Sequence, residues 1–317
     1  MKLRRLFFAL ALVVLAAVLV AVSDAWAPDR PVAELAARWA PPPSEFRTVQ
    51  GMQVHLRDEG PRDDPLPLLL LHGTSASLHT WDGWTQALSP GRRVIRVDLP
   101  GFGLTGPFPH DDYSNERYIE FIAALLDSLA LQQVVVAGNS FGGQVAWESA
   151  AGMPARVAAL VLVDAAGYPF TPESVPLAFQ LARYPVLRPL IEHLLPRRVI
   201  RASLRNVYGD PERVDAALVD RYYELALREG NRRALGLRFA HVMPTEERAA
   251  RIKTITQPTL ILWGGRDRLI PPASAEQFAR DIAGSRLVVF ADLGHVPHEE
   301  APLDTVAVVT DFLSGLD

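Results

Sequence analysis

Residues 134–143 read Val-Val-Val-Ala-Gly-Asn-Ser-Phe-Gly-Gly, and this stretch decides the fold. It opens with an apolar strand and is followed by the helix-like run 144–151. Gly138 and Gly142 flank Ser140 in a Gly-x-Ser-x-Gly turn between the two. A strand–turn–helix connection of this kind is so tight that side chains at the two glycines would collide with neighbouring backbone. It holds the serine in a strained conformation, with its oxygen raised above the sheet. The stretch therefore predicts Ser140 as a nucleophile rather than an incidental serine in a surface turn.

Apolar strands and amphipathic helices alternate on both sides of this turn. The predicted strands are 66–71, 94–97, 134–137, 157–163 and 260–263, with an antiparallel hairpin pair at 46–50 and 52–57. The clearest helix is 114–130, in which apolar residues recur every three or four positions and Ser114 is the expected N-cap. This alternation predicts an open, mostly parallel α/β sheet, which places ligands beyond the carboxyl ends of its strands.

Two further residues complete a candidate catalytic group. A serine hydroxyl becomes nucleophilic at neutral pH with the help of a base, and that base needs an orienting carboxylate. Asp267 and His295 each follow an apolar strand, so both are expected in loops at the carboxyl edge of the sheet. Their order along the chain, after Ser140, is acid and then histidine. Asp164, at the end of an earlier strand, is an alternative acid, and His298 is an alternative base.

Six short motifs, in this order, resemble the α/β-hydrolase superfamily. They are HGTSAS (72–77) with Trp81, DLPGFGLT (98–105), GNSFGG (138–143), VDAAG (163–167), WGGRD (263–267) and GH (294–295) with Pro297 and Glu299. The similarity runs from about Phe46 to the C-terminus. It implies Ser140 as the nucleophile, His295 as the general base and Asp267 as the orienting acid.

The resemblance also narrows the reaction. The GNSFGG motif is most similar to the turn of cap-bearing esterases, lipases and meta-cleavage-product hydrolases, the last of which cleave carbon–carbon bonds. Epoxide hydrolases and haloalkane dehalogenases carry aspartate where Ser140 stands, so those two reactions are disfavoured. In α/β-hydrolases the loop after the strand 66–71 and the residue after the nucleophile supply the two N–H donors of the oxyanion hole. This assigns that role to Thr74 and Phe141, and leaves His72 with a structural one.

Residues 168–252 interrupt the alternation, because they show only helical patterning between two sheet strands. We expect them to form a helical cap over the strand ends, with residues 46–167 and 253–317 forming the α/β core. The predicted cap helices are 175–182, 186–195, 211–228 and 231–242. The cap is rich in aromatic and aliphatic side chains, some of which must line the space above Ser140. An apolar acyl or aryl substrate is therefore expected.

The chain begins with a basic and apolar segment, residues 1–27. Three basic residues precede the uncharged run 6–22, whose 17 residues lie between the length of a signal-peptide core and that of a membrane-spanning helix. We expect an uncleaved membrane anchor, and a cleaved signal peptide or a buried core helix are the alternatives. The positive-inside rule then places the catalytic domain outside the cytoplasm. Residues 28–45 are predicted to form a short helix and a proline-stiffened linker.

The composition narrows the function classes. The 317 residues are 49% hydrophobic, which excludes a disordered chain, and the lack of cysteine excludes a disulfide scaffold and a thiolate metal site. A formal net charge of −4 with interspersed charges argues against nucleic-acid binding. Four arginines within 197–205 favour a solvated surface over a site for a substrate carboxylate or anionic lipid.

The sequence therefore predicts a serine hydrolase that cleaves an ester with an apolar group and needs no metal or organic cofactor. Carbon–carbon bond hydrolysis by the same residues is one alternative. A non-catalytic binding protein on the same scaffold is the other.

Overall fold

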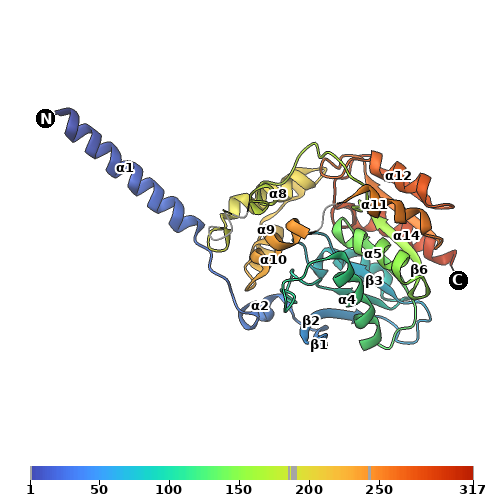
Figure 1. The fold of residues 1–317 in the computed structure, drawn as a ribbon. Helices are drawn as coiled ribbons and strands as arrows, with labels where there is room; N and C mark the ends of the chain where they lie inside the picture. The colour runs from blue at the N-terminus through green and yellow to red at the C-terminus, as the bar shows by residue number, and fades with distance from the viewer. Residues whose placement is uncertain (1, 185, 187–190, 242–243, 317) are drawn as a thin grey trace.

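The computed structural model describes residues 2–184, 186, 191–241 and 244–316, and an eight-stranded sheet forms its centre (Figure 1). The strands are β1 Ser44–Val49, β2 Met52–Glu59, β3 Leu68–Leu71, β4 Val94–Val97, β5 Val134–Asn139, β6 Val157–Val163, β7 Thr259–Gly264 and β8 Arg286–Phe290. Their order in the sheet is β1-β2-β4-β3-β5-β6-β7-β8. The pairs β1–β2 and β2–β4 are antiparallel, and the others are parallel. The predicted mostly parallel α/β sheet is confirmed.

The carboxyl ends of the central parallel strands lie level with one another. In the β3–β5 pair Leu71 stands opposite Gly138, and in the β5–β6 pair Asn139 stands opposite Val163. Residues that follow these strands therefore come together at one edge of the sheet, where open α/β sheets bind ligands. The segments that meet there are 72–74, Ser140 and Asp164.

Helices cover both faces of the sheet, and each face has its own apolar core. One core includes α3 (Asp82–Leu88) and α14 (Pro302–Ser314), and the other includes α4 (Asn115–Ser128), α5 (Phe141–Gly152) and α12 (Ala273–Asp281). Shorter elements are α2 (Val32–Trp39), η1 (Leu78–Trp81), η2 (Pro154–Arg156) and α13 (Pro297–Glu300). The predicted N-cap of α4 is confirmed, since Ser114 Oγ accepts the N–H of Arg117 at 3.3 Å.

Between β6 and β7 the described residues contain helices and no strand. These cap helices are α6 (Leu177–Ala182), α8 (Arg197–Val207), η4 (Pro211–Arg213), α9 (Ala216–Ala226), α10 (Asn231–His241), α11 (Glu246–Ala249) and η5 (Ala250–Thr254). Within the predicted helix 186–195, residues 187–190 lie outside the described residues, and Leu194 forms an isolated bridge with Trp26. Helix α8 lies where the sequence shows a basic run. Its Leu204 is buried, whereas Arg205 is exposed and forms an ion pair with Glu212.

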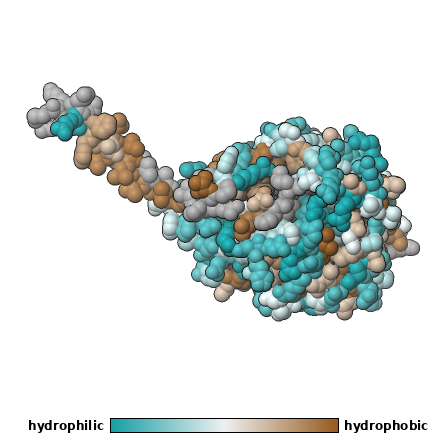
Figure 2. All heavy atoms as spheres, viewed as in Figure 1, coloured by the Kyte–Doolittle hydropathy of each residue, from teal (hydrophilic) through white to brown (hydrophobic). Residues whose placement is uncertain are grey.

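The N-terminal helix α1 (Lys2–Ala25) projects from the body (Figure 1), and much of its described surface is apolar (Figure 2). Its base is attached to the body, since the N–H of Leu195 donates to Ala25 O at 2.8 Å. In the part of the chain that the structure describes, no helix is both long and apolar enough to cross a bilayer. This result does not support the predicted membrane anchor. The predicted location outside the cytoplasm stays a prediction.

Candidate active site

Strand β5 runs into α5 through a sharp turn centred on Ser140, whose φ is +56°. This left-handed backbone conformation is unfavourable for any residue other than glycine, and it persists only where the surroundings hold it. A Cβ on Gly138 would lie 2.2 Å from Gly142 O, and a Cβ on Gly142 would lie 2.2 Å from Leu71 O. The predicted collision of side chains with backbone is confirmed. The turn therefore holds Ser140 at the carboxyl edge of the sheet, at the N-terminus of α5.

The loop after β3 lies directly against this turn. A Cβ on Gly73 would stand 2.7 Å from Asn139 Oδ1 and 3.2 Å from Ser140 Cβ, so the loop approaches closely because residue 73 is glycine. His72 holds the loop in place, since its Nδ1 lies 2.7 Å from Gly73 O and its Nε2 accepts the N–H of Leu99 at 3.0 Å. Burial lowers the pKa of His72, so the ring is neutral with its proton on Nδ1. These contacts agree with the structural role expected for His72.

His295 and Asp267 form a buried pair. Nδ1 of His295 lies 2.6 Å from Oδ2 of Asp267. The other carboxylate oxygen, Oδ1, accepts the backbone N–H groups of Leu269 at 2.8 Å and Ile270 at 3.0 Å. These bonds fix the carboxylate in one orientation. Because Nδ1 donates to Asp267, Nε2 of His295 is left as the proton acceptor.

Asn139 ties the serine turn to the loop that carries His295. Its Nδ2 donates to His295 O at 2.9 Å and to Val163 O at 3.1 Å. The sequence contains Asn139 within a motif but gives it no role, because both acceptors come from distant segments. The predicted site residues come together around this contact: Ser140, Thr74 and His295 line one cavity, Asp267 bonds to His295, and Phe141 begins α5.

The cap helices hold the same loop from the other side. The N–H of His295 donates to Val207 O, at the end of α8, at 2.7 Å. Glu300 accepts the N–H groups of Gly294 at 2.9 Å and Gly209 at 3.0 Å, so its carboxylate joins the histidine loop to the segment after α8. The position of the histidine therefore depends on both the core and the cap helices. No sequence pattern identified Val207 or Glu300.

The alternative residues from the sequence have different surroundings. Asp164 is fully buried, and its Oδ1 accepts the N–H of Gly264 at 2.9 Å. Burial, together with the nearby Asp267 carboxylate, raises the pKa of Asp164 well above its usual value, which favours the neutral acid. The ring of His298 is buried, and its Nε2 lies 3.0 Å from Thr80 Oγ1. In the structure Asp267, not Asp164, bonds to the histidine that lines the cavity.

Asp164, Asp267 and His295 are also the group of possible metal ligands found among the described residues, with their ligand atoms within 4.8 Å of one another. The donor set does not fit an ion. Both oxygens of Asp267 already accept N–H groups, and the nitrogen of His295 that faces it is a donor. Asp164 is favoured as a neutral acid. The polar atoms of these three groups are therefore engaged with protons and are not available to bind an ion.

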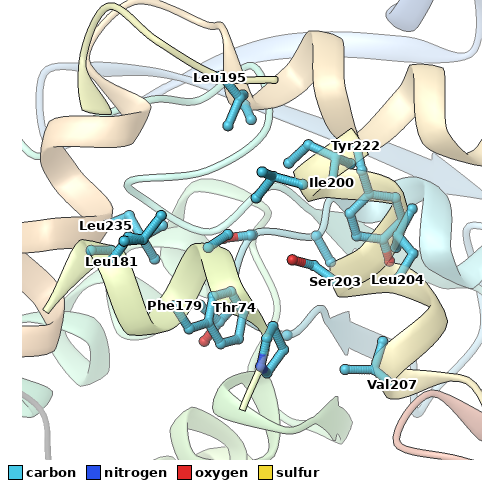
Figure 3. Close-up of a pocket in the computed structure, with 18 of the residues that line it drawn as sticks. Thr74, Phe179, Leu181, Leu195, Ile200, Ser203, Leu204, Val207, Tyr222 and Leu235 are labelled. Carbon is cyan, nitrogen blue, oxygen red and sulfur yellow. The ribbon is translucent and has the colours of Figure 1, made fainter. Parts of the chain in front are cut away.

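A cavity that is partly open to solvent borders Ser140 and His295. Side chains from the cap helices converge on it, as Figure 3 shows for α8 and its neighbours. The lining is dominated by apolar groups, among them Phe179, Leu181, Leu195, Ile200, Leu204, Val207 and Leu235. One guanidinium, that of Arg232, also borders the cavity, but its Nη2 donates to Asp29 Oδ1 at 2.6 Å. The cavity therefore favours an uncharged, apolar group.

A sheet with a serine at its central strand–helix turn, and a histidine–carboxylate pair at the same edge, defines the class of α/β-hydrolases. The family model described as the alpha/beta hydrolase fold matches residues 67–302, and the chain belongs to this family.

The similar proteins are hydrolases of several kinds. The chain is 28% identical to the 2-hydroxymuconate semialdehyde hydrolase of Pseudomonas sp. strain CF600, over 84% of this chain and 92% of that protein. It is 31% identical to the 2-hydroxy-6-oxo-2,4-heptadienoate hydrolase of Pseudomonas putida, over 84% of this chain and 95% of that protein. A crystal structure described as a membrane phospholipase A matches with a TM-score of 0.72 and 26% identity, covering 100% of this chain and 99% of that one.

The substitution Gly138→Ala tests the steric constraint at the turn. Its methyl group would lie 2.2 Å from Gly142 O, so the free energy of unfolding should fall by roughly 3 kcal/mol. Urea unfolding measures the change. Gly91→Ala is the matched control, because its methyl group would meet no atom within 4 Å, and it should change the stability by less than about 0.5 kcal/mol. Equal stabilities for the two variants would contradict the constraint.

The pH dependence of stability tests the protonation of Asp164. Its pKa is raised in the folded protein, whereas the unfolded chain releases this proton near pH 3.8, so stability falls as pH rises above that value. Asp164→Asn stays neutral and should remove this part of the decline. Urea midpoints measured between pH 5 and pH 8 should therefore fall less steeply for the variant than for the wild type. Asp127→Asn, which changes an exposed carboxylate, should leave the slope unchanged. Parallel curves for Asp164→Asn and the wild type would refute the assignment.

Proposed function

We propose that this protein is a serine hydrolase that cleaves a carboxylic ester with an apolar acyl group. The observation that carries the proposal is the buried His295–Asp267 pair at the edge of an apolar cavity that Ser140 also lines. A serine held in a strained turn, a histidine with a free Nε2 and an orienting carboxylate are the parts that acyl transfer needs.

In the proposed mechanism Nε2 of His295 takes the proton of Ser140 as the serine oxygen attacks the acyl carbonyl. Asp267 keeps the imidazole in the required tautomer and stabilises its charged form. The N–H groups of Thr74 and Phe141 donate to the developing oxyanion, and the N-terminus of α5 adds a favourable dipole. The alcohol leaves with the proton from His295. Water then attacks the acyl-enzyme by the same route and releases the acid.

The apolar lining of the cavity supports the proposal that the protein recognises an acyl chain. Its walls offer aliphatic and aromatic side chains from α6, α8 and α10, and burial of each methylene contributes about 0.8 kcal/mol. The similarity to a protein named as a phospholipase, an enzyme class that cleaves acyl esters, agrees with this substrate class.

Hydrolysis of a carbon–carbon bond is the second candidate. Two relatives named for this chemistry, the hydrolases of 2-hydroxymuconate semialdehyde and 2-hydroxy-6-oxo-2,4-heptadienoate, favour it. The same serine, histidine and aspartate would serve both reactions. Steady-state rates with an aryl octanoate and with 2-hydroxy-6-oxo-2,4-heptadienoate separate the two, and the preferred substrate is the one with the larger kcat/KM.

Replacing the proposed nucleophile should abolish the reaction. Ser140→Ala should lower kcat for 4-nitrophenyl octanoate by roughly 10⁴- to 10⁶-fold, because the acyl-enzyme can no longer form. The wild type should also be labelled by a fluorophosphonate at Ser140, as detected by mass spectrometry, whereas the variant should not. Undiminished hydrolysis by the variant would sink the proposal, and a wild type that is neither active nor labelled would favour a non-catalytic binding protein.

Narrowing the cavity should change chain-length preference. Ile200 lies on the cavity side of α8 (Figure 3), so Ile200→Trp should shorten the space for an acyl chain. We expect kcat/KM for a decanoyl ester to fall about tenfold or more while that for an acetyl ester changes little. Arg201→Trp places the same side chain at the next position, which is exposed, and should leave both rates unchanged. Equal losses for both esters would show that this cavity does not hold the acyl chain.

A further inference from the structure

A second chamber, smaller than the apolar cavity, also borders Ser140. It is partly open to solvent, and Thr74, Ser140, Phe179 and Leu269 line both spaces. Phe141, which follows the serine, lines this chamber and not the larger one. Two arginines, Arg183 and Arg238, also line it, and no aspartate or glutamate does so among the described residues. The larger cavity is lined by one arginine, Arg232, which is paired with Asp29, whereas two arginines line the smaller chamber.

Arg238 is a buried cation that contacts Thr74 and Phe141, the two residues whose N–H groups are proposed to bind the oxyanion. The residue is 5% exposed, and its Nη2 donates to Thr74 Oγ1 at 2.6 Å. Its guanidinium carbon lies 4.2 Å from the centre of the Phe141 ring and 5.0 Å from that of Phe239. Nε is buried and has no hydrogen-bond partner among the described residues. The aromatic rings offset part of the cost of burying this charge, but no anion does so.

The lack of a counter-ion sets Arg238 apart from the other arginines buried to the same degree. Each of those has a carboxylate partner: Asp82 at 3.7 Å for Arg57, Glu59 at 2.9 Å for Arg96, and Asp29 at 2.6 Å for Arg232. Burial lowers the pKa of Arg238 to about 10, so the side chain is still charged at neutral pH. A charged donor with a spare N–H, at the wall of a chamber beside the nucleophile, is a binding site for an anionic group.

We propose that Arg238 binds a carboxylate on the alcohol half of the substrate, while the acyl half occupies the large apolar cavity. This inference rests on the proposed ester hydrolysis and specifies its substrate class. In the reaction the acyl–oxygen bond breaks, the proton passes from His295 to the departing alkoxide, and a carboxylate-bearing alcohol leaves from the Arg238 chamber. Arg183, at the exposed rim of that chamber, adds charge of the same sign.

A matched pair of esters tests the proposal. 4-(Octanoyloxy)benzoate and 4-(octanoyloxy)benzamide share the acyl chain and the aromatic ring, but only the first carries a charge. In the wild type the benzoate should have the larger kcat/KM. Arg238→Met should lower kcat/KM for the benzoate roughly 10- to 100-fold relative to the benzamide, because one charge-assisted contact is lost. Arg233→Met, on the same helix at an exposed position paired with Asp111, should leave the ratio unchanged.

Two outcomes would overturn the proposal. Equal losses for both esters would mean that Arg238 acts only by holding Thr74, and unchanged kcat/KM values for both esters would mean that it contacts no substrate. If Arg238→Met does not fold, inhibition of the wild type supplies the same information without a variant. There 4-hydroxybenzoate should inhibit hydrolysis of 4-nitrophenyl octanoate at least tenfold more strongly than 4-hydroxybenzamide, and equal inhibition would refute the anion site.

The binding of 4-hydroxybenzoate separates this proposal from that of ester hydrolysis. Calorimetry with the Ser140→Ala protein measures binding without any reaction, and 4-hydroxybenzoate should bind more tightly than 4-hydroxybenzamide. If the wild type cleaves no ester but this preference is present, the proposed reaction fails and the anion site stands. If esters are cleaved but the preference is absent, the anion site fails and the reaction stands.

Discussion

The close approach of three backbone segments behind Ser140 is the constraint on which the rest of the structure depends. β5, the start of α5 and the loop after β3 come so near to one another that a Cβ on Gly138, Gly142 or Gly73 would overlap its neighbours. That approach requires the carboxyl ends of β3 and β5 to lie level in the sheet, as their register shows. The packed sheet therefore maintains the unfavourable backbone conformation of the serine. The strain lies at one residue, Ser140, but the packing of the whole sheet maintains it.

The histidine loop is held between the core and the cap helices. From the core Asn139 donates to the carbonyl of His295, and from the cap Val207 accepts the N–H of the same residue. Since α8 also lines the apolar cavity, a shift of that helix would change the cavity wall and the position of the imidazole together. The wall of the cavity and the position of His295 thus depend on the same helix. This coupling follows from backbone hydrogen bonds and does not need a flexible segment.

The ionisable groups around the serine are buried, and burial affects the charge of each one differently. Asp267 accepts three N–H groups. Asp164, only a few ångströms away, is favoured as the neutral acid because it is fully buried and the Asp267 carboxylate lies near it. Arg238 lines the smaller chamber at the serine, and no carboxylate among the described residues forms an ion pair with it. Low dielectric surroundings strengthen each of these interactions.

The sequence by itself determined the sheet, the turn at Ser140 and the residue types of the candidate site, because strand periodicity and the glycine spacing are local patterns. It left two alternatives open: Asp164 instead of Asp267 as the acid, and His298 instead of His295 as the base. The tertiary structure decided which of them bond to each other, and it alone gave roles to Asn139, Val207, Glu300 and Arg238. The basic run 197–205 contains no acid, yet the fold brings Asp220 of α9 to Arg197. In each case the partners come from separate segments of the chain, and their contact depends on how the cap helices and the sheet edge pack together. A pattern of neighbouring residues does not encode that packing.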